Sequence, residues 1–472
     1  MNEIPNNGLI RYLGLLNSER LIVTSPKGLS ELLTVKHYEF GKPHDFIVGL
    51  GKILGIGLFL AEGDNHKMQR KNLLPAFAFR HVKELYPAFW DKSRELIDAV
   101  TDQIKAGGIS DGELSLANKV RNTEVEEDEA VIELSEWCSR ATLDIIGATG
   151  LGKDFGSIQD PNNRLAAAYR IITKPSKTAQ FLGIAGMLFP NVIVRNLPVE
   201  RNGQIEEASR IIREECATLI QEKKQRMAKG GRGSQDMDIL SVALESGGFT
   251  DENLVDQMMT FLAAGHETTA SSMTWALYLL CLHPEMQTRM REEVRSRLPS
   301  LDSHQPVTSQ DIDGLAYTNA FCSEVLRYYP PVPLTFRQAF VDSSLLGQKI
   351  PKGTRVMIVP WATNKQESFW GSSNNTFDPE RWLTSNGSTV NANGGANSNY
   401  AFMTFLHGQR SCIGQSFARG EFAALLAACV GRFEFRLNDM NQMDEANVEI
   451  KGGITIKPYG GLFLRTKIVP GW

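Results

Sequence analysis

The chain has 472 residues, of which 42% are hydrophobic, with a formal net charge of −4 and an isoelectric point near 6.1. This is enough for a large core, and nothing in the charge indicates a nucleic-acid partner. The six cysteines are scattered without any C-x-x-C pair, which argues against a disulfide framework and a structural zinc site and favours a reducing compartment.

No segment is long and apolar enough to cross a bilayer. The run from Phe46 to Leu60 is too short and contains Lys52 and several glycines. The run FLGIAGMLFPNVI at 181–193 is also too short; it could touch a lipid surface or pack as a helix end in the core. The chain starts almost at its first strand, so we expect no membrane anchor in it.

Pattern changes along the chain predict one domain, 1–472, that is mainly α with a small β region (α+β). LIRYLGLLNSERLIVTS predicts a hairpin turning at 17–20, and 62–330 has mostly helical spacing. The polar segments 229–238 and 384–400 read as an exposed connector and a long flexible loop. VEIKGGITIKPYGGLFLRTKIV, near the end, predicts short strands with Gly-Gly turns.

The longest predicted helix, 251–283, has an unusual middle, AGHETT. A glycine inside a helix costs ~1 kcal/mol relative to alanine, so Gly265 needs a reason. Ala264, Gly265 and Thr268 share one face and would form a shallow dent with a hydroxyl at its edge; close helix packing is the alternative. His266 lies about 200° around the helix from Thr268, so it should face away, and we assign it no role.

The loop FLHGQRSCIG at 405–414 holds one cysteine between two glycines, and helical spacing begins directly after it. A helix N-terminus favours thiolate, and Gly408 and Gly414 would let the backbone approach the sulfur or a flat ligand. Cys412 could be a nucleophile with His407 as base, as in a cysteine hydrolase, or a single thiolate ligand, as for haem iron.

The loop matches the F-x-x-G-x-R-x-C-x-G signature at every fixed position, and the chain thereby resembles the cytochrome P450 family. The resemblance implies the cytochrome P450 fold, with a long central helix over the haem and the cysteine loop beneath it. It implies that Cys412 is the axial ligand of haem b (iron protoporphyrin IX), that Phe405 packs beside the sulfur and that Arg410 reaches a propionate. AGHETT resembles the family's central-helix motif, in which Thr268 assists oxygen activation and Glu267 belongs to the proton route.

Further charged residues acquire roles through the same resemblance. Glu324 and Arg327 match the E-x-x-R element, which pairs with Arg381 of FDPERW in a buried network that holds the fold. As an isolated pair, Glu324 and Arg327 would more often be a weak surface contact. Removal of one partner from a buried network leaves the others uncompensated, so we expect a structural role and no chemistry here.

Arginines in two other segments suit a cofactor with two propionates. These are Arg337 in PLTFRQA and Arg70 in HKMQRK, where His66 stands in place of the usual tryptophan of W-x-x-x-R and can still donate a hydrogen bond. The basic stretch of Lys67, Arg70, Lys71 and Arg80 could dock an acidic electron donor or be an ordinary solvated helix face.

The resemblance therefore implies a monooxygenase that oxidises a small apolar molecule with O2. No nucleotide-binding segment is visible, so electrons would come from a separate NADPH-cytochrome P450 reductase. The motifs are similar to those of microsomal, filamentous-fungal members of secondary metabolism, which suggests a peripheral place on the cytosolic face of the endoplasmic reticulum, or the cytoplasm. Segments 44–60, 165–200 and 331–336 should line the pocket. A P450-fold isomerase or dehydratase that does not use O2, and a non-catalytic haem protein, are the alternatives.

Overall fold

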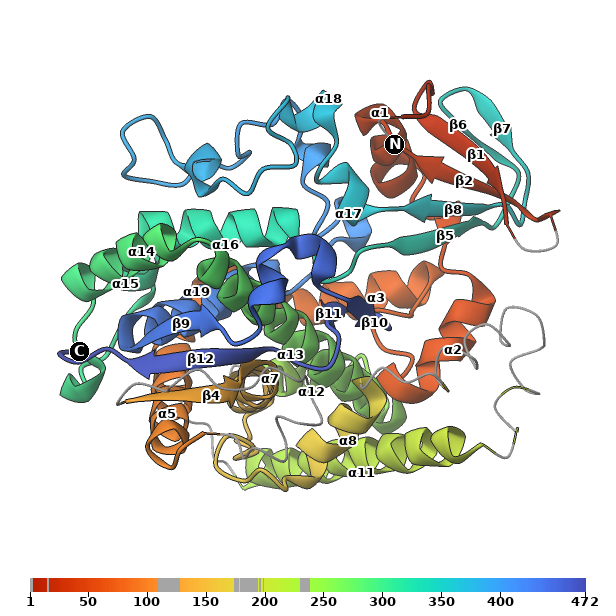
Figure 1. The fold of residues 1–472 in the computed structure, drawn as a ribbon. Helices are drawn as coiled ribbons and strands as arrows, with labels where there is room; N and C mark the ends of the chain where they lie inside the picture. Colours follow the sequence, from red (N-terminus) through yellow and green to blue (C-terminus); the bar gives the residue numbers. More distant parts are fainter. Residues whose placement is uncertain are drawn as a thin grey trace.

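The computed structural model describes residues 3–14, 17–108, 128–173, 178, 194, 197, 199–229 and 238–472. Its longest described helix is α13 (Asp251–Leu282), which runs through the middle of the molecule (Figure 1). The Thr250 side chain caps the helix by accepting from the Asn253 N–H, and acidic residues occupy the first turn, as the sequence predicted.

Helices form most of the described chain. They are α1 (Pro26–Ser30), α2 (His44–Leu54), α3 (Gly63–Leu73), α4 (Phe79–Glu84), α5 (Tyr86–Lys105), α7 (Leu134–Ile145), α8 (Arg164–Thr173), α11 (Glu200–Ala228), α12 (Ile239–Glu245), α14 (Pro284–Arg297), α15 (Ser309–Asp313), α16 (Ala316–Tyr328), α17 (Pro360–Thr363), α18 (Glu367–Trp370) and α19 (Gln415–Arg432). The main apolar core joins α5, α7, α13, α16 and α19, with Trp90, Trp275 and Phe422 fully enclosed.

The strands form small sheets at the edges of this helical body. One sheet has the order β1 (Leu9–Leu13), β2 (Glu19–Val23), β8 (Arg355–Ile358), β5 (Thr335–Ala339), β3 (Phe40–Gly41). Another has the order β4 (Glu129–Glu133), β12 (Phe463–Ile468), β9 (Phe433–Leu437), and two pairs join β6 (Ser343–Leu345) to β7 (Gln348–Ile350) and β10 (Ile450–Gly452) to β11 (Ile456–Pro458). The predicted α+β class is confirmed.

The N-terminal hairpin is confirmed with a shifted turn. β1 and β2 pair antiparallel, with Leu9 opposite Val23 and Leu13 opposite Glu19. Glu19 and Arg20, which the sequence placed in the turn, belong to β2, because cross-strand pairing extends into the polar run.

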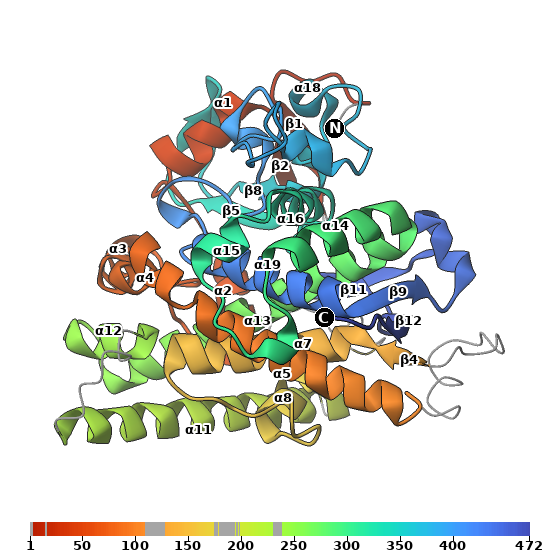
Figure 2. The ribbon, with the colours of Figure 1, turned by 90° about the vertical axis from the view of Figure 1, so that its left-hand side faces the viewer.

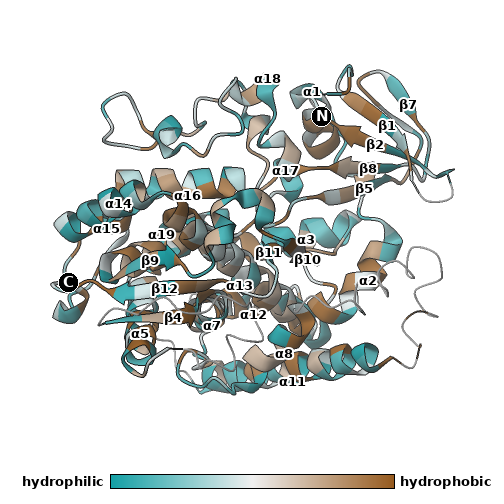
Figure 3. Ribbon diagram, in the orientation of Figure 1, coloured by the Kyte–Doolittle hydropathy of each residue, from teal (hydrophilic) through white to brown (hydrophobic). Residues whose placement is uncertain are grey.

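The layers leave α13 enclosed between helices and sheet. Figure 2 shows α11, α8 and α5 on one side of α13 and the sheet that contains β1, β2 and β8 on the other. Hydrophobic residues colour much of α13 and α19, whereas α11 and α14 carry many hydrophilic ones (Figure 3). Such a pattern places the interior of the fold between α13 and α19.

Two polar segments and one apolar segment were singled out by the sequence. Residues 384–400 lack regular structure apart from a short helical turn at Asn399–Ala401, and Leu383 forms an isolated bridge with Val390. The connector at 229–238 lies mostly, and the apolar run at 181–193 wholly, outside the described residues. Among the helices described here, none combines the length and apolar character needed to traverse a bilayer.

Candidate functional site

The cysteine loop is a tight structure that ends at the start of α19. The Cys412 N–H donates to the Phe405 carbonyl at 2.9 Å, and Gly414 is the residue before the helix. Gly408 has φ +75°, and a Cβ there would lie 2.3 Å from the Leu33 carbonyl oxygen. The loop therefore needs glycine at 408 in order to pack against the helical turn Glu31–Val35.

Cys412 has an accessible surface, although protein atoms surround its thiol. Of the six cysteines, all of which lie in described parts of the chain, Cys412 is the one that is exposed. Burial nevertheless raises the pKa of the Cys412 thiol, while the Gly414 N–H and the Arg70 charge lower it by less. The expectation that the helix N-terminus yields a thiolate is thus wrong for the protein alone, because desolvation outweighs it. A metal cation at the sulfur would reverse that balance.

α13 packs against α19 and presents the predicted small residues. Ala264 is exposed and Thr268 is half-buried in a region of α13 whose other faces are covered. The Thr268 hydroxyl donates to the Ala264 carbonyl at 2.8 Å. His266 faces away as predicted, since it is buried with its ring 4.6 Å from that of Tyr169.

Gly265 has the packing role that the sequence left open. A Cβ on Gly265 would lie 2.8 Å from Cγ1 of Ile146, in the wide helical turn Ile146–Leu151. Gly265 itself is half-buried, like Thr268, so its place in the dent beside Ala264 stays a prediction. The glycine is explained by the close approach of two helical segments.

Buried cations from distant segments converge near the loop. Lys42, Arg337 and Arg410 are 5%, 2% and 9% exposed, and Glu62 is their carboxylate partner among the described residues. Arg410 forms an ion pair with Glu62, and Lys42 Nζ lies 4.0 Å from Glu62 Oε1. The sequence predicted Arg337 and Arg410 but gave no signal for Lys42 or Glu62.

Mutual repulsion among these cations is visible in their pKa values. Burial first, and Arg410 second, lower the pKa of Arg337 to about 10. Burial and Arg337 lower the pKa of Lys42 well below its ordinary value. Burial and then Arg410, Lys42 and Arg70 lower the pKa of His66 to about 3, so His66 is a neutral hydrogen-bonding group at physiological pH.

This cluster fits a ligand with two negative charges. Three basic side chains face one carboxylate, so the cluster has an excess of positive charge, which is costly in a protein interior. Arg410 Nε and His66 Nδ1 are buried and have no hydrogen-bond partner in the described chain. The two propionates of haem would supply the missing charge and acceptors, and Cys412 would supply one thiolate for its iron.

Arg70 occupies a different place from the other cations. Its Nη1 donates to the Ser411 carbonyl at 2.8 Å and its Nη2 to the Ser411 hydroxyl at 3.3 Å. Arg70 therefore ties α3 to the residue before Cys412. Phe405 lies under the Arg419 guanidinium, 5.4 Å away, a cation–π contact that the sequence did not reveal.

The predicted network of Glu324, Arg327 and Arg381 is present and buried. Arg327 Nη2 lies 2.7 Å and Arg381 Nε 3.1 Å from Glu324 Oε1. Arg327 also donates to the Asn364 carbonyl, and the Asn364 side chain bonds to Thr404 at 2.8 Å. The network thus supports the chain that leads into the cysteine loop.

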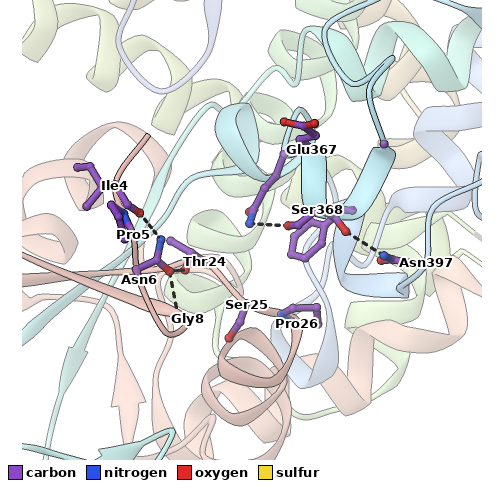
Figure 4. A pocket seen from close by; sticks show the side chains of 13 residues that line it. Ile4, Pro5, Asn6, Gly8, Thr24, Ser25, Pro26, Glu367, Ser368 and Asn397 are labelled. Carbon is purple, nitrogen blue, oxygen red and sulfur yellow. Dashed lines mark hydrogen bonds between the residues drawn. The ribbon is translucent and has the colours of Figure 1, made fainter. Parts of the chain in front are cut away.

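A surface groove lies elsewhere, between the N-terminal segment and α18 (Figure 4). Asn6, Thr24 and Ser25 line one side, and Ser368 and Asn397 the other. None of the residues singled out by the motifs lines this groove, and Glu367 is its one acidic residue. The groove has no part in the site described above.

Comparison of the sequence with known proteins points to the same family as the residues of the site. The pattern that defines the cytochrome P450 family matches residues 7–464. The chain is 43% identical to cytochrome P450 monooxygenase ALT8 of Alternaria alternata over 100% of this chain and 84% of that protein. It is 45% identical to cytochrome P450 monooxygenase sphH of Aspergillus fumigatus over 99% of this chain and 82% of that protein. These similarities imply a haem cofactor, iron binding and oxidoreductase activity, and the chain belongs to the cytochrome P450 family.

Proposed function

We propose that this protein is a haem-thiolate monooxygenase that oxidises a small apolar molecule with O2 and electrons from NADPH-cytochrome P450 reductase. The observation that carries the proposal is the exposed Cys412, two residues after Arg410 of a buried cluster with an excess of basic side chains. When bound, the haem would supply the redox chemistry that activates dioxygen.

The side chains would divide the work as follows. Cys412 would provide the iron ligand, and Arg410, Arg337 and Lys42 would neutralise the propionates. His66 would donate to a propionate from its neutral ring. Arg70 would keep the cysteine loop in place through Ser411.

The α13 residues would leave room for the reacting molecules and would transfer protons. Ala264 has a short side chain, which leaves room beside the Thr268 hydroxyl. The Thr268 hydroxyl, which donates to the Ala264 carbonyl, would instead hold a water or a reacting group in the dent, and Glu267 would belong to the proton route that ends there. A P450-fold enzyme that does not use O2 would need neither group.

Partner and substrate class are inferred from surface charge and relatives. Lys71 and Arg80 are exposed on or next to α3 and α4, a basic surface in an acidic protein that suits an acidic reductase. The fungal relatives support a role in secondary metabolism. Segment 44–60 packs on α13, where the Leu54 carbonyl accepts from the Thr260 hydroxyl at 2.7 Å. Most of the predicted segment 165–200, from residue 174 onward, lies outside the described residues.

Cys412→Ala tests the proposal directly. The purified chain is loaded with haem, reduced under carbon monoxide and examined by difference absorption spectroscopy. We expect the strongly red-shifted band of thiolate-ligated haem in the unmodified protein, loss of that band in Cys412→Ala, and its retention in Cys429→Ala. Cys429 is a matched control because it is a buried cysteine on α19. An unchanged band in Cys412→Ala would refute the assignment, and failure of the unmodified chain to bind haem would refute the function.

A further inference from the structure

Glu267 lies on the face of α13 that carries the β10–β11 hairpin. Ser271 and Trp275 follow Glu267 by one and two helical turns and therefore share its face. Both donate to the Ile456 carbonyl of β11, Ser271 Oγ at 2.7 Å and Trp275 Nε1 at 3.0 Å. The hairpin is thus fixed along the helix at the level of Glu267.

The residues on either side of Ile456 reach the Glu267 carboxylate. Thr455 Oγ1 donates to Glu267 Oε1 at 3.0 Å, and Lys457 Nζ lies 3.0 Å from the same oxygen. Residues two apart in a strand point to the same side, so docking of Ile456 places both groups together. Glu267 Oε2 is buried and has no hydrogen-bond partner within the described chain.

Within the described residues, the basic side chain that forms an ion pair with Glu267 is Lys457. His266 Nε2 lies 3.8 Å from Glu267 Oε2, but burial lowers the pKa of His266, and its Nδ1 is 2.8 Å from the Leu262 carbonyl. Burial raises the pKa of the Cys138 thiol well above its ordinary value, and the Lys457 charge lowers it by less.

Two opposing effects set the ionisation of Glu267. Burial, the largest effect, raises the pKa of Glu267, and Lys457, His266 and Thr455 together lower it by more. The net direction is downward. Ionised Glu267 thus depends on the hairpin, because desolvation alone would favour the neutral acid.

We propose that Lys457 is a positioning residue for Glu267: its ammonium group keeps the carboxylate ionised and, with Thr455, holds it against the β10–β11 hairpin. The inference deepens the proposed function, because it concerns the acid that would serve the proton route there. The Lys457 side chain is 20% exposed and that of Glu267 is 12% exposed. The hairpin would therefore set the pH range in which Glu267 can accept and pass on a proton.

Infrared spectroscopy of the haem-loaded protein tests this inference. Loss of an adjacent opposite charge should move the titration of Glu267 upward by about 1–3 pH units. We therefore expect the carbonyl stretch of protonated Glu267 to persist to a higher pH in Lys457→Met than in the unmodified protein, and Lys457→Met combined with Glu267→Gln to remove this titrating band. Lys457→Arg should restore the unmodified spectrum, and Lys349→Met on the exposed strand β7 should leave it unchanged.

Unfolding as a function of pH gives a second measurement. A carboxylate whose folded pKa is lowered stabilises the fold above its unfolded pKa and loses that contribution as pH falls through the folded pKa. The loss of stability in Lys457→Met should therefore be larger at pH 7 than near pH 4, where Glu267 is increasingly protonated in the unfolded chain. Lost packing alone would give a difference that does not depend on pH.

The failures of the two proposals are distinguishable. A carboxyl band that titrates at the same pH in Lys457→Met and in the unmodified protein overturns the positioning role while the carbon monoxide spectrum of Cys412 haem persists. A stability loss that is equal at both pH values overturns it too. Loss of that spectrum in the unmodified protein overturns the monooxygenase instead. If the band that shifts in Lys457→Met survives Glu267→Gln, the shift belongs to another acid, which also overturns the inference.

Discussion

Glu324→Gln should destabilise the protein strongly, because this fully buried carboxylate accepts hydrogen bonds from several side chains and one backbone N–H. It accepts from Arg327 Nε and Nη2 at 2.7 Å each, from Arg381 Nε at 3.1 Å, from Trp382 Nε1 at 2.8 Å and from the Asp378 N–H at 2.8 Å. Glutamine has nearly the same shape but no charge, and its amide would place a donor against donors.

The expected cost follows from what remains after the substitution. Arg327 is 0% exposed and would keep its charge without the carboxylate partner. Breaking a buried pair by removal of one partner costs about 3–5 kcal/mol in free energy of unfolding. Urea unfolding followed by circular dichroism, together with haem content, would measure the loss.

A second Glu–Arg pair at helical spacing provides the control. Arg80 and Glu84 lie 3.7 Å apart with side chains 95% and 64% exposed. Glu84→Gln should change stability by about 0–1 kcal/mol because solvent screens such pairs. If Glu324→Gln costs no more than Glu84→Gln, burial of the network does not determine its contribution, and the reasoning is refuted.

Two further substitutions test the cation cluster and the central helix. A lysine whose folded pKa is lowered destabilises the folded protein at every pH below its unfolded pKa. Lys42→Met should therefore raise the urea midpoint of the haem-free protein at pH 7, and it should also speed the transfer of haem to a haem acceptor. Faster haem loss without the gain in stability would contradict the charge argument. Gly265→Ala should cost about 1–3 kcal/mol because its Cβ would meet Cγ1 of Ile146, and the same substitution should cost less in an Ile146→Ala background, which lacks Cγ1. Equal costs of Gly265→Ala in the two backgrounds would exclude that contact.

Local patterns predicted the central helix, the cysteine loop and the terminal strands, because spacing, caps and turns are encoded within a few residues. Glu324 and Arg327 are neighbours on one helical turn, but only the family resemblance connected them to Arg381. Lys42 and Glu62 were missed because each is an isolated charge in its segment. Their proximity to Arg410 depends on how β3, α3 and the cysteine loop pack, which no local pattern contains.

The sign of the Cys412 pKa shift was wrong for the same physical reason. A helix N-terminus is a local feature that a sequence reveals, whereas desolvation depends on everything folded around the sulfur. Glu267 shows the opposite outcome under the same rule, since Lys457 crosses from a distant strand and overcomes its burial.

The cation cluster and Glu267 differ in how their charge is balanced. The cluster has an excess of positive charge where the cofactor would bind, whereas Glu267 has a counter-charge from the protein itself. Lys42, Arg337 and Arg410 outnumber Glu62, so the fold gains stability when a dianion arrives. Glu267 has its counter-charge supplied by the hairpin and requires no ligand for it. Haem binding should therefore change the stability of the cation cluster far more than the ionisation of Glu267, so the infrared response of Lys457→Met should be the same before and after haem is loaded.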